Sequence, residues 1–111
     1  MEFAITEYKH CDLIEISGRI DSYTAPQIDH ALQALITDDR NNIVIDMQEV
    51  SYISSSGILA FVNIQRRFLR QNRGKLVFSG ISELVYSAFE LSGFHTLFEF
   101  YDDVVSAVGG F

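Results

Sequence analysis

Two short apolar runs without polar alternation place the strongest constraint on the fold of this chain. They occupy residues 43–45 and 76–78 and contain only Ile, Val, Leu and Phe. Runs of this kind are typical of strands that are covered on both faces, as in parallel sheets. Between them, and on either side, apolar residues recur at helical spacing. Strands that alternate with helices predict a largely parallel sheet joined by right-handed crossovers.

The remaining segments complete the order β-β-α-β-α-β-α-β-α. Residues 3–6 and 13–17 predict two half-buried strands that form an antiparallel hairpin, and residues 97–101 predict a last strand. The predicted fold class is therefore α/β. We expect one domain over residues 1–111, with a mostly parallel, mixed five-stranded sheet, an N-terminal antiparallel hairpin and about four helices.

Capping signals mark the expected helices. Thr24 and Gln27 have the spacing of a capping box, which predicts the start of the first helix. The second helix is expected from Ser56 to about Asn72, with Gly74 as a C-cap signal. Ser82 caps the third helix, and Asp102 or Asp103 caps a short fourth one. Residues 18–23 and 46–55 are expected to be loops. The expected inner faces of the first three helices are Ile28, Leu32, Leu35 and Ile36; Ile58, Phe61, Val62, Phe68 and Leu69; and Leu84, Val85, Ala88 and Phe89.

Composition excludes several classes of protein. With 48% hydrophobic and 21% charged residues, the chain has the composition of an ordered domain. A net charge of −7 argues against a broad nucleic-acid surface, because phosphate binding needs a positive field. The single Cys11 leaves no internal disulfide and no Cys pair for zinc. No apolar run suggests a membrane span and no signal peptide is visible, so the cytoplasm is the expected location.

Residues 46–58 carry the most information about function, because three consecutive serines, Ser54, Ser55 and Ser56, stand directly before Gly57. This segment joins a central strand to a helix N-terminus, and sites in open α/β sheets gather beyond the carboxyl ends of strands. The free N–H groups at a helix start favour negative charge. The hydroxyls are therefore suited to capping the helix and also to carrying a phosphate group.

The same segment resembles the signature of the STAS domain family, in particular the bacterial anti-sigma factor antagonists. That signature has an aspartate, a short loop, a hydrophobic residue, Asp-Ser-Ser-Gly or Asp-Ser-Ala-Gly, and an aliphatic helix start. Residues 18–21 and 93–102 resemble its weaker flanking motifs. One position departs from it, since Ser54 stands where the family usually has Asp, beside the phosphoacceptor. The matching residues are Asp46, Val50, Ile53, Ser55, Ser56, Gly57 and Ile58.

The resemblance implies a non-enzymatic docking module for partner switching, with no cofactor and no metal. Such a module binds a serine kinase that acts as an anti-sigma factor, and thereby regulates transcription. The kinase phosphorylates the serine before the motif glycine, here Ser56 with Ser55 as the alternative, and a serine phosphatase resets the switch. A non-phosphorylated STAS docking subunit of a lipid-transport or stress-signalling assembly is the alternative. The expected docking surface is Asp21, Tyr52, Ile53, Ser54, Ser55, Ser56, Gly57 and Leu59.

The hypotheses of a serine hydrolase and of a metal site have less support from the sequence. A nucleophile elbow needs Gly two residues before Ser56, where this chain has Ser54. The histidines have no spacing that identifies a general base or a metal site. They are His10, His30 and His95.

Arg66, Arg70 and Arg73 share a helix face, which fits either a solvated surface or a patch for an acidic partner. Leu59 and Ile64 do not fit the inner stripe of their helix and would form an apolar patch if exposed.

Overall fold

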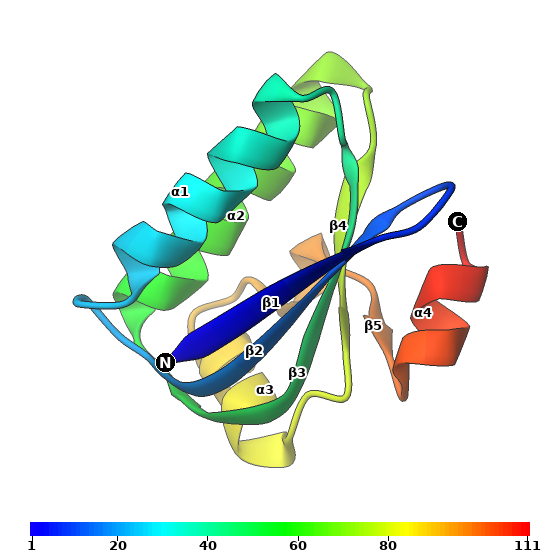
Figure 1. Cartoon of the computed structure of the whole chain (residues 1–111). Coiled ribbons are helices and arrows are strands. Elements are labelled where there is room, and N and C mark those ends of the chain that lie inside the picture. Colours follow the sequence, from blue (N-terminus) through cyan, green and yellow to red (C-terminus); the bar gives the residue numbers. More distant parts are fainter.

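The sheet has five strands in the order β1-β2-β3-β4-β5, in a computed structural model that describes residues 1–111 (Figure 1). β1 pairs with β2 in antiparallel orientation, and each of the other neighbouring pairs is parallel. This arrangement confirms the predicted mixed sheet with an N-terminal hairpin. The strands are β1 (Glu2–Glu7), β2 (Asp12–Ile20), β3 (Asn42–Ile53), β4 (Lys75–Ser79) and β5 (Phe100–Tyr101).

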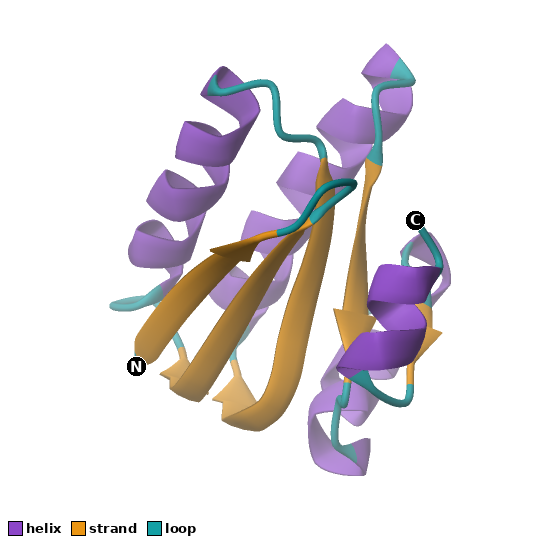
Figure 2. Ribbon diagram, turned by 45° about the vertical axis from the view of Figure 1, so that its right-hand side comes forward, coloured by secondary structure: helices purple, strands orange, loops and turns teal.

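Helices cover both faces of the sheet, as the unalternating strands predicted. Three helices, α1 to α3, pack on one face, and the short α4 lies on the other (Figure 2). Ile45 and Phe78 belong to the larger core cluster on the α1–α3 side. Val44 and Val77 belong to the smaller one, with Ala107 of α4. The helices are α1 (Ala25–Thr37), α2 (Ser55–Gln71), α3 (Glu83–Leu91) and α4 (Val104–Gly109), with a 3₁₀ turn, η1 (His95–Leu97), after α3.

Aromatic rings fill the larger core around Phe78, which is fully buried. Its ring centroid lies 5.1 Å from that of Phe61, 5.2 Å from Phe89 and 4.9 Å from Phe98. These three contacts are edge-to-face, a favourable geometry for aromatic pairs. The cluster joins α2, β4, α3 and the segment before β5 into one packed unit.

β1 differs from its prediction, because the strand is exposed along its whole length and not half-buried. Phe3 and Ile5 keep 38% and 43% of their surface accessible. Their cross-strand partners, Ile16 and Ile14, are buried in the α1–α3 core. The reason is position: β1 is an edge of the sheet, so it lacks the coverage that the inner strands receive.

β3 is longer than predicted and includes most of the expected loop at 46–55. Its second half pairs with β2, which likewise runs on to Ile20 through part of the expected loop at 18–23. Two register shifts interrupt this pairing, between Glu15 and Ser17 and between Gly18 and Arg19. Irregularities of this kind break the simple alternation of polar and apolar residues, which is why the segment resembled a loop. The last predicted strand is shorter than expected, since residue 97 ends the 3₁₀ turn.

The helices follow their predicted positions, but some of their faces differ. Leu69 and Leu84, expected inside, are 54% and 71% exposed, whereas Ile64, expected off the inner face, is buried. Thr24 precedes α1 without forming a capping hydrogen bond, so the predicted capping box is wrong. Asn72 takes the left-handed conformation that ends α2, two residues before the predicted Gly74. Ser82 caps α3 as expected, and Asp103, one of the two predicted candidates, caps α4.

Gln65 is a buried polar residue that links α2 to two other elements. Its amide nitrogen donates to the Leu97 carbonyl at 3.1 Å, and its amide oxygen accepts from the Leu76 N–H at 2.8 Å. Replacing Gln65 with Leu leaves that buried N–H without a partner, which costs about 1–3 kcal/mol. We therefore expect Gln65→Leu to lower the free energy of unfolding by this amount in urea denaturation. Gln71→Leu, at an exposed position of the same helix, is the control; equal stability of both variants would contradict the assigned role.

Candidate functional site

The carboxyl ends of β2 and β3 meet at one corner of the molecule and bring the predicted site residues together. Ile20 and Ile53 are direct partners at the end of the parallel ladder. Immediately beyond them, the Ser54 N–H donates to the Ile20 carbonyl at 2.8 Å. The loop that begins at Asp21 therefore lies beside the serines at the start of α2, as the sequence predicted.

The three serines differ in their structural roles. Ser54 is the N-cap of α2, with its hydroxyl accepting from the Gly57 N–H at 3.2 Å. Ser55 and Ser56 follow in the first turn, and both are exposed. The serine that replaces the family's usual Asp thus retains a capping function, since Ser and Asp are comparable N-caps. The two serines that follow leave their hydroxyls on the surface, next to the free N–H groups of the helix.

Gly57 allows α2 to begin against the sheet. A Cβ atom at this position would lie 2.6 Å from Cγ2 of Ile20 and 2.9 Å from Cγ1 of Ile53, closer than packed atoms approach. Both isoleucines are buried and β-branched, so neither side chain moves aside easily. The glycine of the motif therefore fixes how close the serines lie to the ends of β2 and β3.

We expect Gly57→Ala to lower the free energy of unfolding by about 1–2 kcal/mol. Overpacking of a tight site costs about 1–3 kcal/mol, and the better helix propensity of Ala offsets part of that cost. Gly109→Ala in α4 is a matched control, because a Cβ there meets no atom within 4 Å. Thermal unfolding of both variants checks the prediction, and a Gly57→Ala protein as stable as the parent would refute it.

Asp21 shapes the loop between β2 and α1. Its Oδ1 accepts from the backbone N–H groups of Tyr23 and Thr24 at 3.0 and 3.2 Å, and its own N–H donates to the Thr24 hydroxyl at 2.8 Å. Desolvation raises the pKa of Asp21, but these hydrogen bonds outweigh it, so the pKa lies below the usual value. The carboxylate is consequently ionised at neutral pH and holds the loop in place.

An apolar groove between the end of β3 and α3 extends this corner. Leu84 and Leu91 of α3 are 71% and 90% exposed, and Tyr52 is 40% exposed. Arg19 lies 4.2 Å from the centre of the Tyr52 ring and covers one of its faces. The sequence analysis assigned Leu84 and Ala88 to the inner face of α3 and did not connect them, or Leu91, with the site. The groove is lined by Tyr52, Ile53, Leu84, Val85, Ser87, Ala88 and Leu91.

We define the switch face as this groove together with the predicted residues at the adjoining ends of β2 and β3 and at the start of α2, namely Asp21, Tyr52, Ile53, Ser54, Ser55, Ser56, Gly57 and Leu59. Ser55, Ser56, Tyr52 and Leu59 are exposed on it. Ile53 and Gly57, also predicted to bind a partner, are buried; they pack beneath the exposed residues of the switch face. Protein interfaces commonly combine aromatic and aliphatic anchors with a polar rim. The switch face has this composition, and its exposed hydroxyls lie within it.

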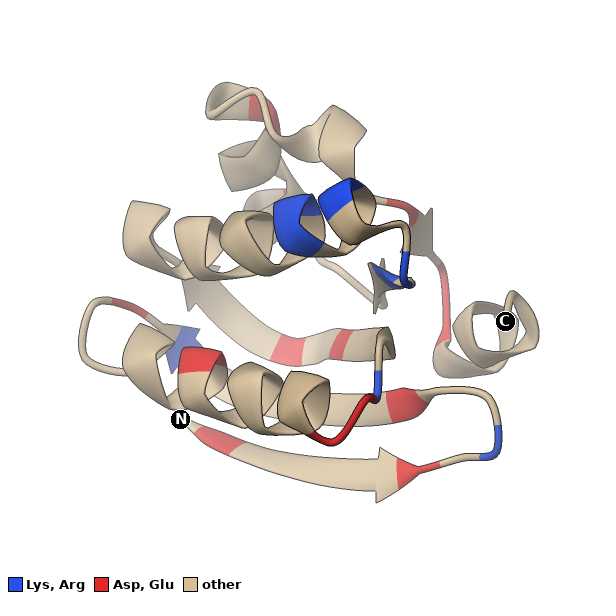
Figure 3. Ribbon diagram, turned by 90° about the horizontal axis from the view of Figure 1, so that it is seen from above, with Lys and Arg blue, Asp and Glu red and all other residues tan.

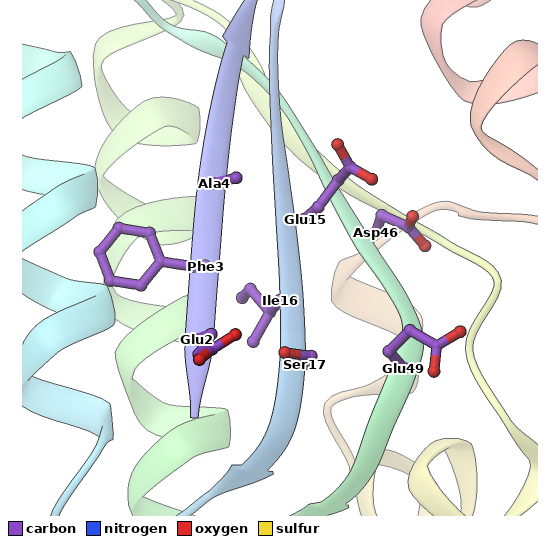
Figure 4. A pocket seen from close by; sticks show the side chains of 8 residues that line it. All are labelled: Glu2, Phe3, Ala4, Glu15, Ile16, Ser17, Asp46 and Glu49. Atoms are coloured by element: carbon purple, nitrogen blue, oxygen red, sulfur yellow. The ribbon is translucent and has the colours of Figure 1, made fainter.

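A group of acidic side chains lies on the face of the sheet that carries α4. Glu2, Glu15, Asp46 and Glu49 line a shallow pocket on the part of the sheet that α4 leaves uncovered (Figure 4).

The structure contains no group of three or more His, Cys, Asp and Glu side chains placed to hold a metal ion. Basic side chains lie in the second half of α2, at Arg66, Arg67 and Arg70, and in the turn after it, at Arg73 (Figure 3). None of the helices has the length and apolarity required to span a membrane.

Comparison with known proteins identifies the family. Residues 2–107 match the sequence model of the family described as "STAS domain". The chain belongs to the STAS domain family. Within this family it is 36% identical over 90 residues to the anti-sigma-B factor antagonist of Listeria monocytogenes, covering 81% of this chain and 77% of the relative. Anti-sigma factor antagonists are regulators and not enzymes, which agrees with the sequence-based prediction.

Solved STAS structures share the fold of this chain. An anti-sigma factor antagonist from Mycobacterium paratuberculosis superimposes with a TM-score of 0.87 at 19% identity, over 98% of this chain and 92% of that one. The antagonist SpoIIAA in its unphosphorylated form superimposes with a TM-score of 0.79 at 19% identity, covering 99% and 98% of the two chains. The phosphorylated form of SpoIIAA, from Bacillus, gives 0.76 at 16% identity and covers 98% of each chain. The predicted single STAS fold is confirmed.

Proposed function

We propose that this STAS protein is an anti-sigma factor antagonist that binds a serine-kinase anti-sigma factor through the switch face. Phosphorylation of Ser56 by that kinase ends the complex, and a serine phosphatase restores it. The observation that carries the proposal is an exposed hydroxyl at the first turn of α2, next to an exposed apolar groove. The similarity to the anti-sigma-B factor antagonist of Listeria monocytogenes supplies the class of partner.

The position of Ser56 explains how a phosphate could act on binding and spare the fold. The hydroxyl is exposed, and the N–H groups of the first turn of α2 favour a negative charge there. In a complex, the same phosphate would add about −1.5 to −2 charges between two surfaces. A charge of that size must be desolvated or paired, so the free-energy cost falls on the interface.

One feature favours a second function, that of a STAS docking subunit that is never phosphorylated. Ser54 stands where the family usually has an acidic residue before the serine pair. A kinase or phosphatase that recognises its target through this carboxylate would therefore lack that contact. The cap of α2 does not distinguish the two functions, because Ser54 performs the capping in either case.

Phosphosite mapping with the cognate serine kinase tests the proposal. We expect mass spectrometry to find one phosphate on the Ser54–Gly57 segment of the parent protein and of Ser55→Ala, and none on Ser56→Ala. Phosphate on the parent and on Ser56→Ala, but not on Ser55→Ala, would move the phosphoacceptor to Ser55. A complex with the kinase but no phosphate on any of the three proteins would establish the docking-subunit alternative.

A further inference from the structure

The outer edge of β1 is a free strand edge, uncovered along the four residues between Glu2 and Glu7. β1 pairs on one side only, with β2, and no helix lies beyond it in the view from above (Figure 3). All six of its residues are exposed. Natural edge strands are usually protected by charged side chains, especially lysine, by proline, by a bulge or by a covering loop. The charged residues of β1, Glu2 and Glu7, stand at its two ends; the sequence EFAITE has neither lysine nor proline, and its pairing with β2 is regular.

Apolar side chains accompany this free backbone. Phe3 and Ile5 point to the face of the sheet that carries α1 and are partly exposed there. With Ala34 and Leu35 of α1 they line an apolar groove that runs along the edge. The edge therefore offers unpaired backbone hydrogen-bonding groups and an apolar surface to the same partner.

We propose that this edge is a dimer interface, at which β1 pairs in antiparallel orientation with β1 of a second copy. The two copies then form one continuous sheet, related by a two-fold axis that passes midway between their Ala4 residues. Such an isologous contact closes on itself and leaves no free edge at β1. This proposal is independent of the proposed function, because no residue of the switch face lies on β1.

Backbone geometry limits the registers available to two identical strands. In an antiparallel ladder the outward-pointing N–H and C=O groups belong to alternate residues. Two copies of β1 can therefore pair only with odd residues opposite odd ones and even residues opposite even ones. This excludes the register that would place Glu2 opposite Glu7 of the second copy.

Among the remaining registers, the one centred on Ala4 matches the side chains best. It places Phe3 opposite Ile5 of the second copy, twice by symmetry, and Glu2 opposite Thr6. Cross-strand aromatic and β-branched pairs of this kind stabilise sheets, and no like charges face each other. A register centred on Ile5 would instead place Phe3 opposite Glu7. A register centred on Phe3 would pair fewer residues.

Cysteine cross-linking tests this register directly. Residues opposite each other in a ladder have Cα atoms about 4.5–5.5 Å apart, within the range that a disulfide spans. In the proposed dimer only Ala4→Cys meets its own copy, whereas Glu2→Cys and Thr6→Cys are each about 14 Å from theirs. The native Cys11 is buried and does not interfere.

We expect Ala4→Cys to form a covalent dimer under mild oxidation roughly a hundredfold faster than either control, because paired thiols react at an effective concentration on the order of millimolar. A mixture of Glu2→Cys and Thr6→Cys should cross-link to each other, although each alone does not. Equal rates for Ala4→Cys and the two single controls would overturn the proposal.

Sedimentation equilibrium of the untagged protein provides the second measurement. We expect the parent to be dimeric at high concentration and Ile5→Lys to be monomeric, because a lysine on the edge blocks strand pairing. Leu69→Lys is the matched control, since Leu69 is also an exposed apolar residue but lies on α2; it should remain dimeric. A monomeric parent up to millimolar concentration would refute the dimer. Ile5→Lys should still bind the kinase, so failure of this proposal is distinguishable from failure of the proposed function.

Discussion

Ser56→Asp is expected to weaken binding of the serine-kinase anti-sigma factor by roughly 150-fold, a free-energy change of about 3 kcal/mol. The substitution places a carboxylate at an exposed position of the switch face, where a bound partner would remove its water. The helix start itself accommodates the charge, so thermal stability should stay close to that of the parent. Isothermal titration of the two proteins with the kinase measures the difference.

Ser106→Asp is a matched control for this experiment. Ser106 is an exposed serine in the first turn of α4, on the opposite side of the sheet from α2. It receives the same charge in a similar helical position but outside the switch face, and should bind as the parent does. Equal affinity of Ser56→Asp and Ser106→Asp would remove Ser56 from the interface.

Phe78→Ala should lower the free energy of unfolding by about 3–5 kcal/mol, the range found for truncation of a buried Phe. Phe78 is fully buried on a central strand, and its ring packs against those of Phe61, Phe89, Phe98 and Phe100. Removing it leaves a cavity that four other rings surround. Since domains are stable by only about 5–15 kcal/mol, much of the native stability would be lost.

Urea denaturation with Leu84→Ala as the control checks this prediction. Leu84 is 71% exposed, so its truncation should change the stability by no more than about 0.5 kcal/mol. The same variant should weaken kinase binding, because Leu84 lines the apolar groove of the switch face. Similar stability losses in Phe78→Ala and Leu84→Ala would show that the aromatic cluster is not the centre of the core.

Sequence patterns predicted the parts of the fold that depend on local signals. The uninterrupted apolar runs identified β3 and β4. Ser82 was recognised as a cap from its place before an apolar helical segment, and Asp103 was one of two candidates for the cap of α4, with Asp102. The predictions of burial that depend on tertiary position were wrong for β1, Leu69 and Leu84. Exposure of β1 follows from its place at the edge of the sheet, and a strand pattern alone does not state that place.

The candidate site was also predicted only where a local sequence signal exists. Ser56 and its neighbours could be identified from a contiguous motif, and the structure brings the Asp21 loop beside them. Leu84 and Leu91 could not be connected with the site, because α3 is distant in sequence and reaches the end of β3 only through folding. Leu84 was also assigned to the core, since a helical stripe does not reveal how far the buried face extends.

The unequal lengths of the strands have a consequence for local unfolding. β4 pairs with β3 only from Asn42 to Asp46, so the second half of β3 has β2 as its one neighbour in the sheet. A ladder with one neighbour opens at lower free-energy cost than one held on both sides. Amide hydrogens of residues 47–53 should therefore exchange with solvent sooner than those of residues 43–45. The three serines follow this more labile half directly, so a partner that covers them would also slow exchange along the strand that carries them.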